Sequence, residues 1–289
     1  ELLAKGEVKY FIGWEKGSLP WQSPPAFVTK PEEADRLIWD QYCLTNLTVY
    51  LLDDRYVDGK IGLLVKGCDS RAVVRLIQDQ QFDRDKVYLV GIPCSGMRDA
   101  EVAARVGQAG DPNYQDVPLA RKCQECTHRN PVLYDVLIGE PVEEEMPGAQ
   151  EKIASRIDQL ASQGLNERYA FWEKAYSRCI RCYACRNICP ACDCPTCYLD
   201  APRSDWLSKA VGTAGNAAYG LTRALHVAGR CIQCGECERA CPVNIPIMTL
   251  NQKIARDINE LFGPYEAGMS VDSPLPLGEY RADDPGEFL

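Results

Sequence analysis

The sequence contains no apolar run long enough to cross a bilayer. Stretches such as residues 61–65 have the length of a strand, whereas a transmembrane helix needs at least ~18 apolar residues. The sequence also has no excess of positive charge: 41 Asp and Glu residues outnumber 32 Lys and Arg residues and give a formal net charge of −9. Since phosphate groups are bound by basic surfaces, this balance argues against nucleic acid as a partner.

Histidines and nucleotide-binding motifs are scarce as well. The only histidines are His128 and His226, and neither lies in a pattern typical of acid–base catalysis. We expect both to pack or hydrogen-bond near metal sites, with direct ligation as the alternative. No Gly-x-Gly-x-x-Gly fingerprint follows either of the two predicted strands described below, so no motif indicates FAD or nicotinamide binding.

Cysteine, in contrast, is abundant. Sixteen cysteines occur in 289 residues, without a recognisable secretory signal and without the spacing of a disulfide framework. This combination predicts a reducing compartment, which we take to be the cytoplasm, and cysteines that bind metal.

Eight of these cysteines form two copies of one motif, Cys-x-x-Cys-x-x-Cys-x-x-x-Cys-Pro, which starts at Cys179 and again at Cys231. This is the ligand run of bacterial-type 4Fe–4S sites, in which three thiolates hold one cluster and the fourth crosses to the other. Zinc sites or disulfides are the alternatives, but zinc typically uses separated pairs of ligands. We therefore assign one cluster to Cys179, Cys182, Cys185 and Cys241, and the other to Cys231, Cys234, Cys237 and Cys189.

Residues 1–145 alternate between strand and helix patterns. Residues 60–66 and 86–92 are short apolar runs bounded by turns, as is typical of buried strands. Residues 70–80 between them have one apolar helical face, with Asp69 or Ser70 available as N-cap. A strand–helix–strand unit of this length makes the two strands parallel, so the sequence predicts a small parallel sheet.

Three further features belong to this part of the chain. Residues 32–52 predict a helix, and residues 132–138 are a candidate for a third strand. The N-terminal aromatic residues, which we expect to lie on a surface made for a partner, are Tyr10, Phe11, Trp14 and Trp21.

From residue 149 onward the pattern becomes helical. Helices are predicted around residues 153–160 and 169–176, between the two cysteine runs at 207–227, and after the second run at 250–261. The fold class is therefore an α/β N-terminal domain with a small parallel sheet, followed by a mainly α-helical domain that carries a dicluster ferredoxin-like module. The predicted domains are 1–148 (α/β), 149–263 (helical, dicluster) and 264–289, an extended tail rich in proline and acidic residues.

A second set of cysteines belongs to the α/β domain. Cys68 and Cys94 directly follow the two predicted strands, at the edge of a parallel sheet where ligands bind. If the strands are neighbours, these thiols lie about 5–10 Å apart. Cys123-x-x-Cys126 supplies a second pair, so the sequence predicts a third cluster on four thiolates. A zinc site and buried structural cysteines are the alternatives.

Charged residues flank Cys68. Lys66, Asp69 and Arg71 are candidates for neutralising cluster charge or for holding a nucleotide phosphate. The alternative is an ordinary capped, solvated turn.

The four remaining cysteines are Cys43, Cys192, Cys194 and Cys197. The last three form a Cys-x-Cys-x-x-Cys stretch that is too dense for core packing, which favours metal ligation and a fourth cluster that includes Cys43. Alternatively, Cys43 joins the set that contains Cys68.

Four stretches of the sequence carry a family resemblance: residues 65–71 (VKGCDSR), 90–97 (VGIPCSGM), 182–190 (CYACRNICP) with the Cys192–Cys197 extension, and 228–242 (AGRCIQCGECERACP). On these stretches the chain resembles the beta-subunit family of deazaflavin-reducing hydrogenases and formate dehydrogenases. The resemblance implies an electron-transfer subunit of a larger redox complex, of the hydrogenase, formate dehydrogenase or heterodisulfide reductase-like type found in anaerobes. Several members of that family carry FAD and reduce a deazaflavin.

The predicted function is therefore electron relay through three or four 4Fe–4S clusters between other redox subunits, without bond chemistry in the chain itself. Two alternatives are a flavin-binding catalytic subunit that reduces a deazaflavin or nicotinamide, and a metal-centred enzyme built on the Cys192–Cys197 stretch. The sequence names neither the electron donor nor the acceptor.

Overall fold

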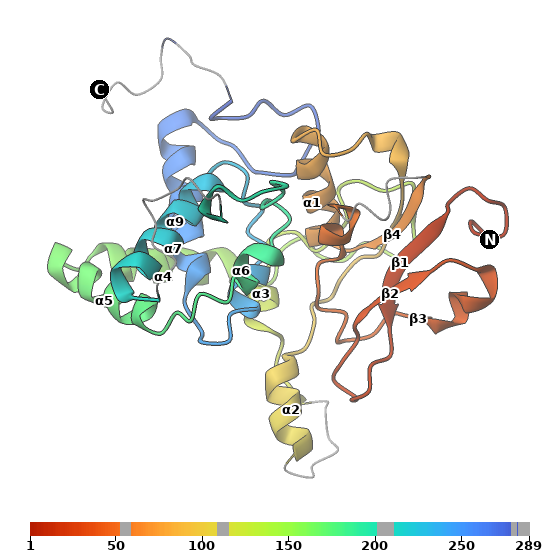
Figure 1. Ribbon diagram of the computed structural model, residues 1–289, viewed down its shortest axis with the longest axis horizontal. Coiled ribbons are helices and arrows are strands. Elements are labelled where there is room, and N and C mark those ends of the chain that lie inside the picture. The colour runs from red at the N-terminus through yellow and green to blue at the C-terminus, as the bar shows by residue number, and fades with distance from the viewer. Residues whose placement is uncertain (53–58, 109–115, 201–210, 279–281, 283–289) are drawn as a thin grey trace. The chain divides into compact units, whose positions relative to one another are not determined.

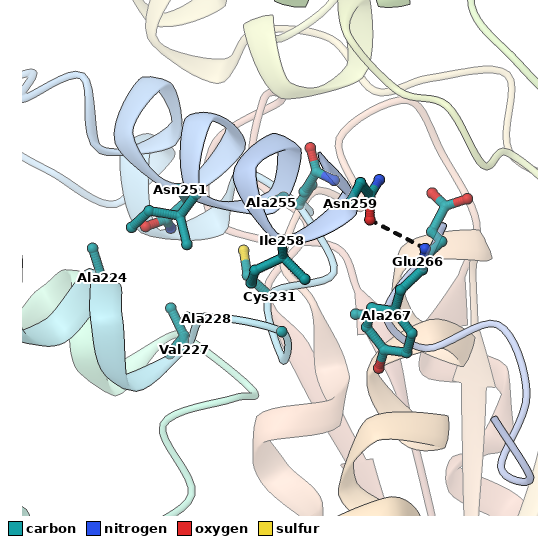
Figure 2. A pocket seen from close by; sticks show the side chains of 14 residues that line it. Ala224, Val227, Ala228, Cys231, Asn251, Ala255, Ile258, Asn259, Glu266 and Ala267 are labelled. Atoms are coloured by element: carbon teal, nitrogen blue, oxygen red, sulfur yellow. Dashed lines mark hydrogen bonds between the residues drawn. The ribbon is translucent and has the colours of Figure 1, made fainter. Parts of the chain in front are cut away.

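The computed structural model describes residues 1–52, 59–108, 116–200, 211–278 and 282. The chain divides into two compact units, Glu1–Ala149 and Gln150–Leu289, called here the first and the second unit (Figure 1). No helix in the described segments is long and apolar enough to span a membrane.

The first unit is built on a six-stranded sheet in the order β2-β1-β4-β5-β6, and β3 pairs with the end of β1 that lies beyond its pairing with β4. The strands are β1 (Tyr10–Glu15), β2 (Pro25–Val28), β3 (Leu37–Ile38), β4 (Ile61–Val65), β5 (Val87–Gly91) and β6 (Val136–Leu137). The strands β1, β4, β5 and β6 run parallel, which confirms the strands expected at 60–66 and 86–92.

The sheet is mixed, however, so the expected small parallel sheet is found only in the part formed by β1, β4, β5 and β6. Both β2 and β3 run antiparallel to β1. The segment between β1 and β2 contains no helix, and a direct return of this kind produces an antiparallel pair, whereas a parallel pair needs a crossover connection.

The N-terminal aromatic residues form core rather than a partner surface, which corrects a second prediction. Tyr10, Phe11 and Trp14 lie in β1 and are 7%, 8% and 0% exposed. Because β1 is an interior strand covered on both faces, its residues are buried without the alternation that marks a half-exposed strand. Trp21 is partly buried and packs against a small cluster around Tyr42.

The helix expected over residues 32–52 is also absent. The segment forms two 3-10 helices, Pro31–Arg36 and Leu47–Leu52, with β3 between them. The side chain of Asp40 accepts a hydrogen bond from Tyr42 N at 2.8 Å, and that of Asn46 accepts one from Thr48 N at 3.0 Å. Such local side-chain bonds compete with helical ones and turn the chain instead.

Helix α1 (Gly67–Gln78) connects β4 to β5, together with the 3-10 helix Arg84–Lys86. Its N-cap is Lys66, three residues before the expected position. Asp69 lies at the third helical position, and its Oδ2 accepts a hydrogen bond from Lys66 N at 3.0 Å. Two more helices of this unit are α2 (Ala100–Gln108) and α3 (Arg121–Gln124).

The second unit is helical in its described segments. Its helices are α4 (Ala149–Ala161), α5 (Leu165–Ser177), α6 (Ala184–Asn187), the 3-10 helix Tyr198–Asp200, α7 (Thr213–His226), α8 (Glu236–Arg239) and α9 (Ile247–Phe262). Helix α5 packs on α7 so closely that a Cβ at Gly220 would lie 2.3 Å from the Tyr176 ring. The expected start of α7 at Leu207 lies outside the described residues. The tail contains neither helix nor strand in its described part, residues 263–278 and 282.

Candidate iron–sulfur sites

The two cysteine runs fold into the same loop. In each run the residues on either side of the second cysteine have positive φ, at Arg181 (53°) and Tyr183 (61°) and at Gln233 (58°) and Gly235 (73°). A four-residue helix, α6 or α8, follows at once. This left-handed winding lets three closely spaced thiols surround one point, as a cubane cluster requires.

Left-handed backbone is unfavourable for residues other than glycine, and Tyr183 is compensated by packing. Its ring meets that of Tyr219 edge-on at 5.4 Å between centroids. The Arg186 guanidinium lies 4.6 Å from the Tyr183 ring centroid. The glycine at the equivalent position of the second loop needs no such support.

A cavity of about 510 Å³ lies beside the first loop. Its lining contains all four cysteines that the sequence assigns to one cluster, Cys179, Cys182, Cys185 and Cys241, although Cys241 belongs to the second run. The aromatic and basic residues around them include Tyr219 and Arg223 from α7. The structure therefore brings this crossed set together; we call its proposed occupant the first-loop cluster.

The complementary set gathers at the second loop. Burial raises the pKa of Cys237, and the neighbouring thiolates of Cys189 and Cys231 raise it further. Burial and the Glu236 carboxylate raise the pKa of Cys234, and Cys189 adds to the effect. Cys189 thus lies close to the second run, as the crossed assignment requires. The proposed occupant of this set, Cys231, Cys234, Cys237 and Cys189, is called the second-loop cluster.

Hydrogen-bond donors surround the sulfur atoms of both sets. Ile245 N donates to Cys241 Sγ at 3.4 Å, and Asn251 Nδ2 lies 3.9 Å from Cys237 Sγ. The hydroxyl of Tyr219 lies 3.8 Å from Cys185 Sγ. Thiolate ligands with such donors suit an anionic iron–sulfur cluster rather than a hard cation.

Within the described parts of the chain, no three His, Cys, Asp or Glu side chains are grouped tightly enough to hold one metal ion. Zinc would need four ligands that all reach one ion, at about 2.3 Å for sulfur. In a cubane each thiolate binds its own iron, so the ligands stand further apart. The loose grouping of the sulfur atoms is compatible with clusters.

Four of the five cysteines of the first unit, Cys68, Cys94, Cys123 and Cys126, come from three segments and also lie close together. Burial raises the pKa of Cys126 to about 11, and the thiolates of Cys123 and Cys94 contribute. Burial and the Asp69 carboxylate raise the pKa of Cys68 well above its usual value, and Cys126 adds to this. Lys66 and Lys122 lower the pKa values of these thiols, so two cations face the set. We call Cys68, Cys94, Cys123 and Cys126 the sheet-edge set.

Lys66 and Asp69 are engaged within the protein. Lys66 Nζ lies 2.9 Å from Asp69 Oδ2, donates to Thr45 O at 3.1 Å and lies 3.9 Å from the centroid of the Trp14 ring. Asp69 Oδ1 accepts a hydrogen bond from Leu47 N at 2.7 Å. The turn is capped, as in the alternative that the sequence left open for these charged residues. It is buried, however, rather than solvated.

Arg71, the third of these charged residues, is buried and directed at a histidine. Its Nη1 lies 2.8 Å from His128 Nδ1. Burial and this arginine lower the pKa of His128 to about 4, so its ring is neutral at pH 7. The His128 carbonyl accepts a hydrogen bond from Cys126 Sγ at 3.3 Å, while His226 lies against the Tyr198 ring.

The last four cysteines do not form one described group. Cys43 lies in the core of the first unit, where Asp40 N donates to its Sγ at 3.3 Å, and burial raises its pKa to about 12. In the second unit, a hydrogen bond from Cys192 lowers the pKa of Cys189 to about 6. Cys194 is exposed, and Cys197 hydrogen-bonds Arg186.

The chain is similar to a domain family and to curated proteins. Residues 178–246 match the family model described as a 4Fe-4S dicluster domain. The chain is 24% identical over 350 residues to the F420-dependent formate dehydrogenase subunit beta of Methanocaldococcus jannaschii, with 95% of this chain and 90% of the relative covered. It is 24% identical over 354 residues to the F420-dependent formate dehydrogenase 1 subunit beta of Methanococcus maripaludis, with 96% and 90% covered.

Among solved structures, the xenon-derivatised F420-reducing NiFe hydrogenase complex from Methanosarcina barkeri is similar at 20% identity and a TM-score of 0.30, over 37% of this chain and 39% of that chain. The resemblance predicted from the sequence is confirmed by the two curated relatives and by the family model. The chain carries a 4Fe–4S dicluster domain and is related along nearly its whole length to the beta subunits of F420-dependent formate dehydrogenases.

Proposed function

We propose that the chain is an iron–sulfur electron-transfer subunit of a multi-subunit oxidoreductase, relaying electrons between partner subunits. The observation that carries this proposal is the cavity of about 510 Å³ that gathers Cys179, Cys182, Cys185 and the crossed Cys241. Two 4Fe–4S clusters in such a module supply one-electron transfer and no bond chemistry.

The residues of the chain set the conditions for that transfer. The first-loop cluster is held by Cys179, Cys182, Cys185 and Cys241, and the second-loop cluster by Cys231, Cys234, Cys237 and Cys189. Cys182 of the first-loop set is exposed, whereas every ligand of the second-loop set is buried or partly buried. Electrons therefore exchange with a partner at the first-loop cluster, where the protein covers the ligands least, while Asn251 and Ile245 donate hydrogen bonds to sulfur in the interior.

The sheet-edge set holds a third cluster in this proposal. Its four thiols gather beside Lys66 and Lys122, whose charges offset that of an all-thiolate cluster. The α/β domain 1–148 thus contributes one redox site, the helical domain 149–263 two, and the tail 264–289 a surface for partners. We assign Cys43 to packing, because it is fully buried among apolar residues. Cys192, Cys194 and Cys197 remain candidates for a fourth cluster.

The partners are proposed from the relatives, whose names place them in formate dehydrogenases that depend on F420. We expect other redox subunits of a formate dehydrogenase, hydrogenase or heterodisulfide reductase-like complex, in the reducing cytoplasm that the cysteine usage suggests.

The second candidate is a catalytic subunit that binds FAD and reduces a deazaflavin, and the names of the relatives favour it. Against it, Lys66 and Asp69 already pair with one another. Flavin absorbance in anaerobically purified protein would support this candidate, and an active complex whose chain contains no flavin would exclude it.

The test of the relay is the amount of iron and acid-labile sulfide per chain after anaerobic purification. About 12 iron atoms are expected from three 4Fe–4S clusters, and about 16 if the Cys192–Cys197 stretch holds a fourth. A value near 8 would restrict the clusters to the two loops and refute the role proposed for the sheet-edge set.

A further inference from the structure

Arg223 is a buried cation in the last turn of α7, and several cysteines lie around it. It is 4% exposed, and its Nη2 donates to the backbone oxygen of Cys185 at 2.9 Å. Its Nε and Nη1 are buried without a hydrogen-bond partner. Because burying a charged group without a counter-ion is unfavourable, a negatively charged neighbour is expected at this position.

Burial lowers the pKa of Arg223, but nearby thiolates raise it well above its usual value. These thiolates are those of Cys189, Cys237, Cys192 and Cys185. Cys185 belongs to the first-loop set, whereas Cys189 and Cys237 belong to the second-loop set. Arg223 also lines the cavity that holds the first-loop ligands. Arg223 therefore contacts the first-loop ligand set directly, and its charge also acts on two thiolates of the second-loop set.

We propose that Arg223 is the shared counter-ion of the two module clusters and raises the reduction potentials of both. This inference rests on the proposed function, because it requires both clusters to be present. Reducing a 4Fe–4S cluster adds one negative charge to the site. A buried cation nearby stabilises the reduced form more than the oxidised form, and N–H donors to sulfur act in the same direction.

Tyr219 provides an internal comparison, since it lies one turn before Arg223 on the same helix. Its hydroxyl is near the sulfur of Cys185 and carries no charge. Its removal should therefore affect the first-loop cluster alone, and by less. A charge control is Arg256 on α9, which pairs with Asp158 and Glu260.

The experiment is a redox titration of the full chain, followed by electron paramagnetic resonance, in the wild type and in four variants. For Arg223→Gln we expect the ratio of reduced to oxidised cluster at a fixed potential to fall about tenfold at both clusters, which equals a decrease of about 59 mV. Arg223→Lys keeps the charge and should change the ratio less than threefold. Tyr219→Phe should change only the first-loop cluster, and Arg256→Gln neither.

Each other outcome is decisive. Unchanged potentials in an Arg223→Gln protein with full iron content would overturn the proposal, as would an Arg223→Lys protein that shifts as far as Arg223→Gln. If Arg223→Gln does not retain its iron, Arg223→Lys decides alone: potentials near the wild type support the proposal, and loss of iron in both variants assigns Arg223 a purely structural role. A wild-type protein without the cluster pair would refute the proposed function before any variant is compared.

Discussion

The two units obtain their cysteine sites in opposite ways. The first unit has a large apolar core on its sheet, with Trp14, Leu63 and Leu89 fully buried, and the ligands Cys94 and Cys123 are only two of its many members. The sheet-edge set lies where β4 and β5 end and where one later segment, with Cys123 and Cys126, returns to them. In the second unit the module core is small and consists partly of the ligands themselves, since Cys237 and Cys241 are among its buried members and Cys179 and Cys185 pack against it.

This difference has a thermodynamic meaning. Where most of the core consists of residues other than the ligands, the fold forms the site, and losing the metal costs mainly the site. Where ligands supply much of the core, metal binding and folding are one equilibrium, and the metal contributes most of the folding free energy. The following predictions test how far this contrast holds.

The largest expected effect is that of removing iron. Protein prepared without iron should keep slow hydrogen exchange in β4, β5 and α1, because their protection comes from the sheet and its core. Amides of residues 178–246 should exchange near the rate of an unfolded chain, because thiols without a cluster leave the module with little core. Hydrogen-exchange mass spectrometry of the two preparations measures this. Equal loss of protection in both units would show that both depend on iron for folding to the same extent.

Within the second unit, the next largest effect is the loss of one whole cluster from a single substitution. Cys182→Ser, Cys241→Ser and Cys189→Ser should each remove about four iron atoms. Because the fourth ligand of each run crosses to the other cluster, two double variants should lose different amounts of iron. Cys182→Ser with Cys241→Ser affects one cluster, so it removes no more iron than either substitution alone. Cys182→Ser with Cys189→Ser affects both clusters and removes about eight.

Iron analysis of the five proteins against the wild type measures this prediction. The reverse pattern, in which Cys182 and Cys189 act as one site and Cys241 as another, would mean that each run holds its own cluster.

In the first unit the site depends on the fold through a single close approach. A Cβ at Gly67 would lie 2.3 Å from His128 O, so the first residue of α1 and the segment after Cys126 fit together only with glycine there. Gly67→Ala should lower the free energy of unfolding by about 2 kcal/mol through overpacking, and displace Cys126 enough to remove about four iron atoms.

The control is Gly6→Ala, since a Cβ at Gly6 meets nothing within 4 Å. It should leave the iron content unchanged, even though its φ of 69° makes alanine somewhat unfavourable. Full iron content in Gly67→Ala would show that the sheet-edge set tolerates movement of its segment.

The same contrast explains what could be predicted from the sequence. The two runs were recognisable because their ligand spacing is local and repeated, and the family model confirms the module. To predict the sheet-edge set, one first had to predict that β4 and β5 are parallel neighbours. The apolar runs at 60–66 and 86–92 made that prediction possible.

For other features of the structure, the sequence contains no recognisable pattern. A strand buried on both faces shows no alternation, so the sequence pattern does not reveal that the aromatic residues of β1 are buried. The pattern at 32–52 resembles a helix, but the side-chain bonds of Asp40 and Asn46 turn the chain instead. Tyr219 and Arg223 stand four residues apart on an ordinary amphipathic helix, so only the packing of α7 against the cysteine loops reveals them.

The smallest predicted effect concerns the two cysteine loops of the second unit. It tests whether they share one backbone conformation but differ in the side-chain packing that stabilises it. Gly235 has φ of 73°, where alanine costs about 1 kcal/mol, and nothing replaces the ring packing that supports Tyr183 in the first loop. Gly235→Ala should lower the free energy of unfolding by about this amount, measured by thermal unfolding of the iron-loaded chain. Gly235→Asn should cost less, because asparagine tolerates the left-handed region. If alanine and asparagine cost the same, the strain in this loop comes from side-chain bulk near the cluster rather than from φ, and the two loops differ in more than their surroundings.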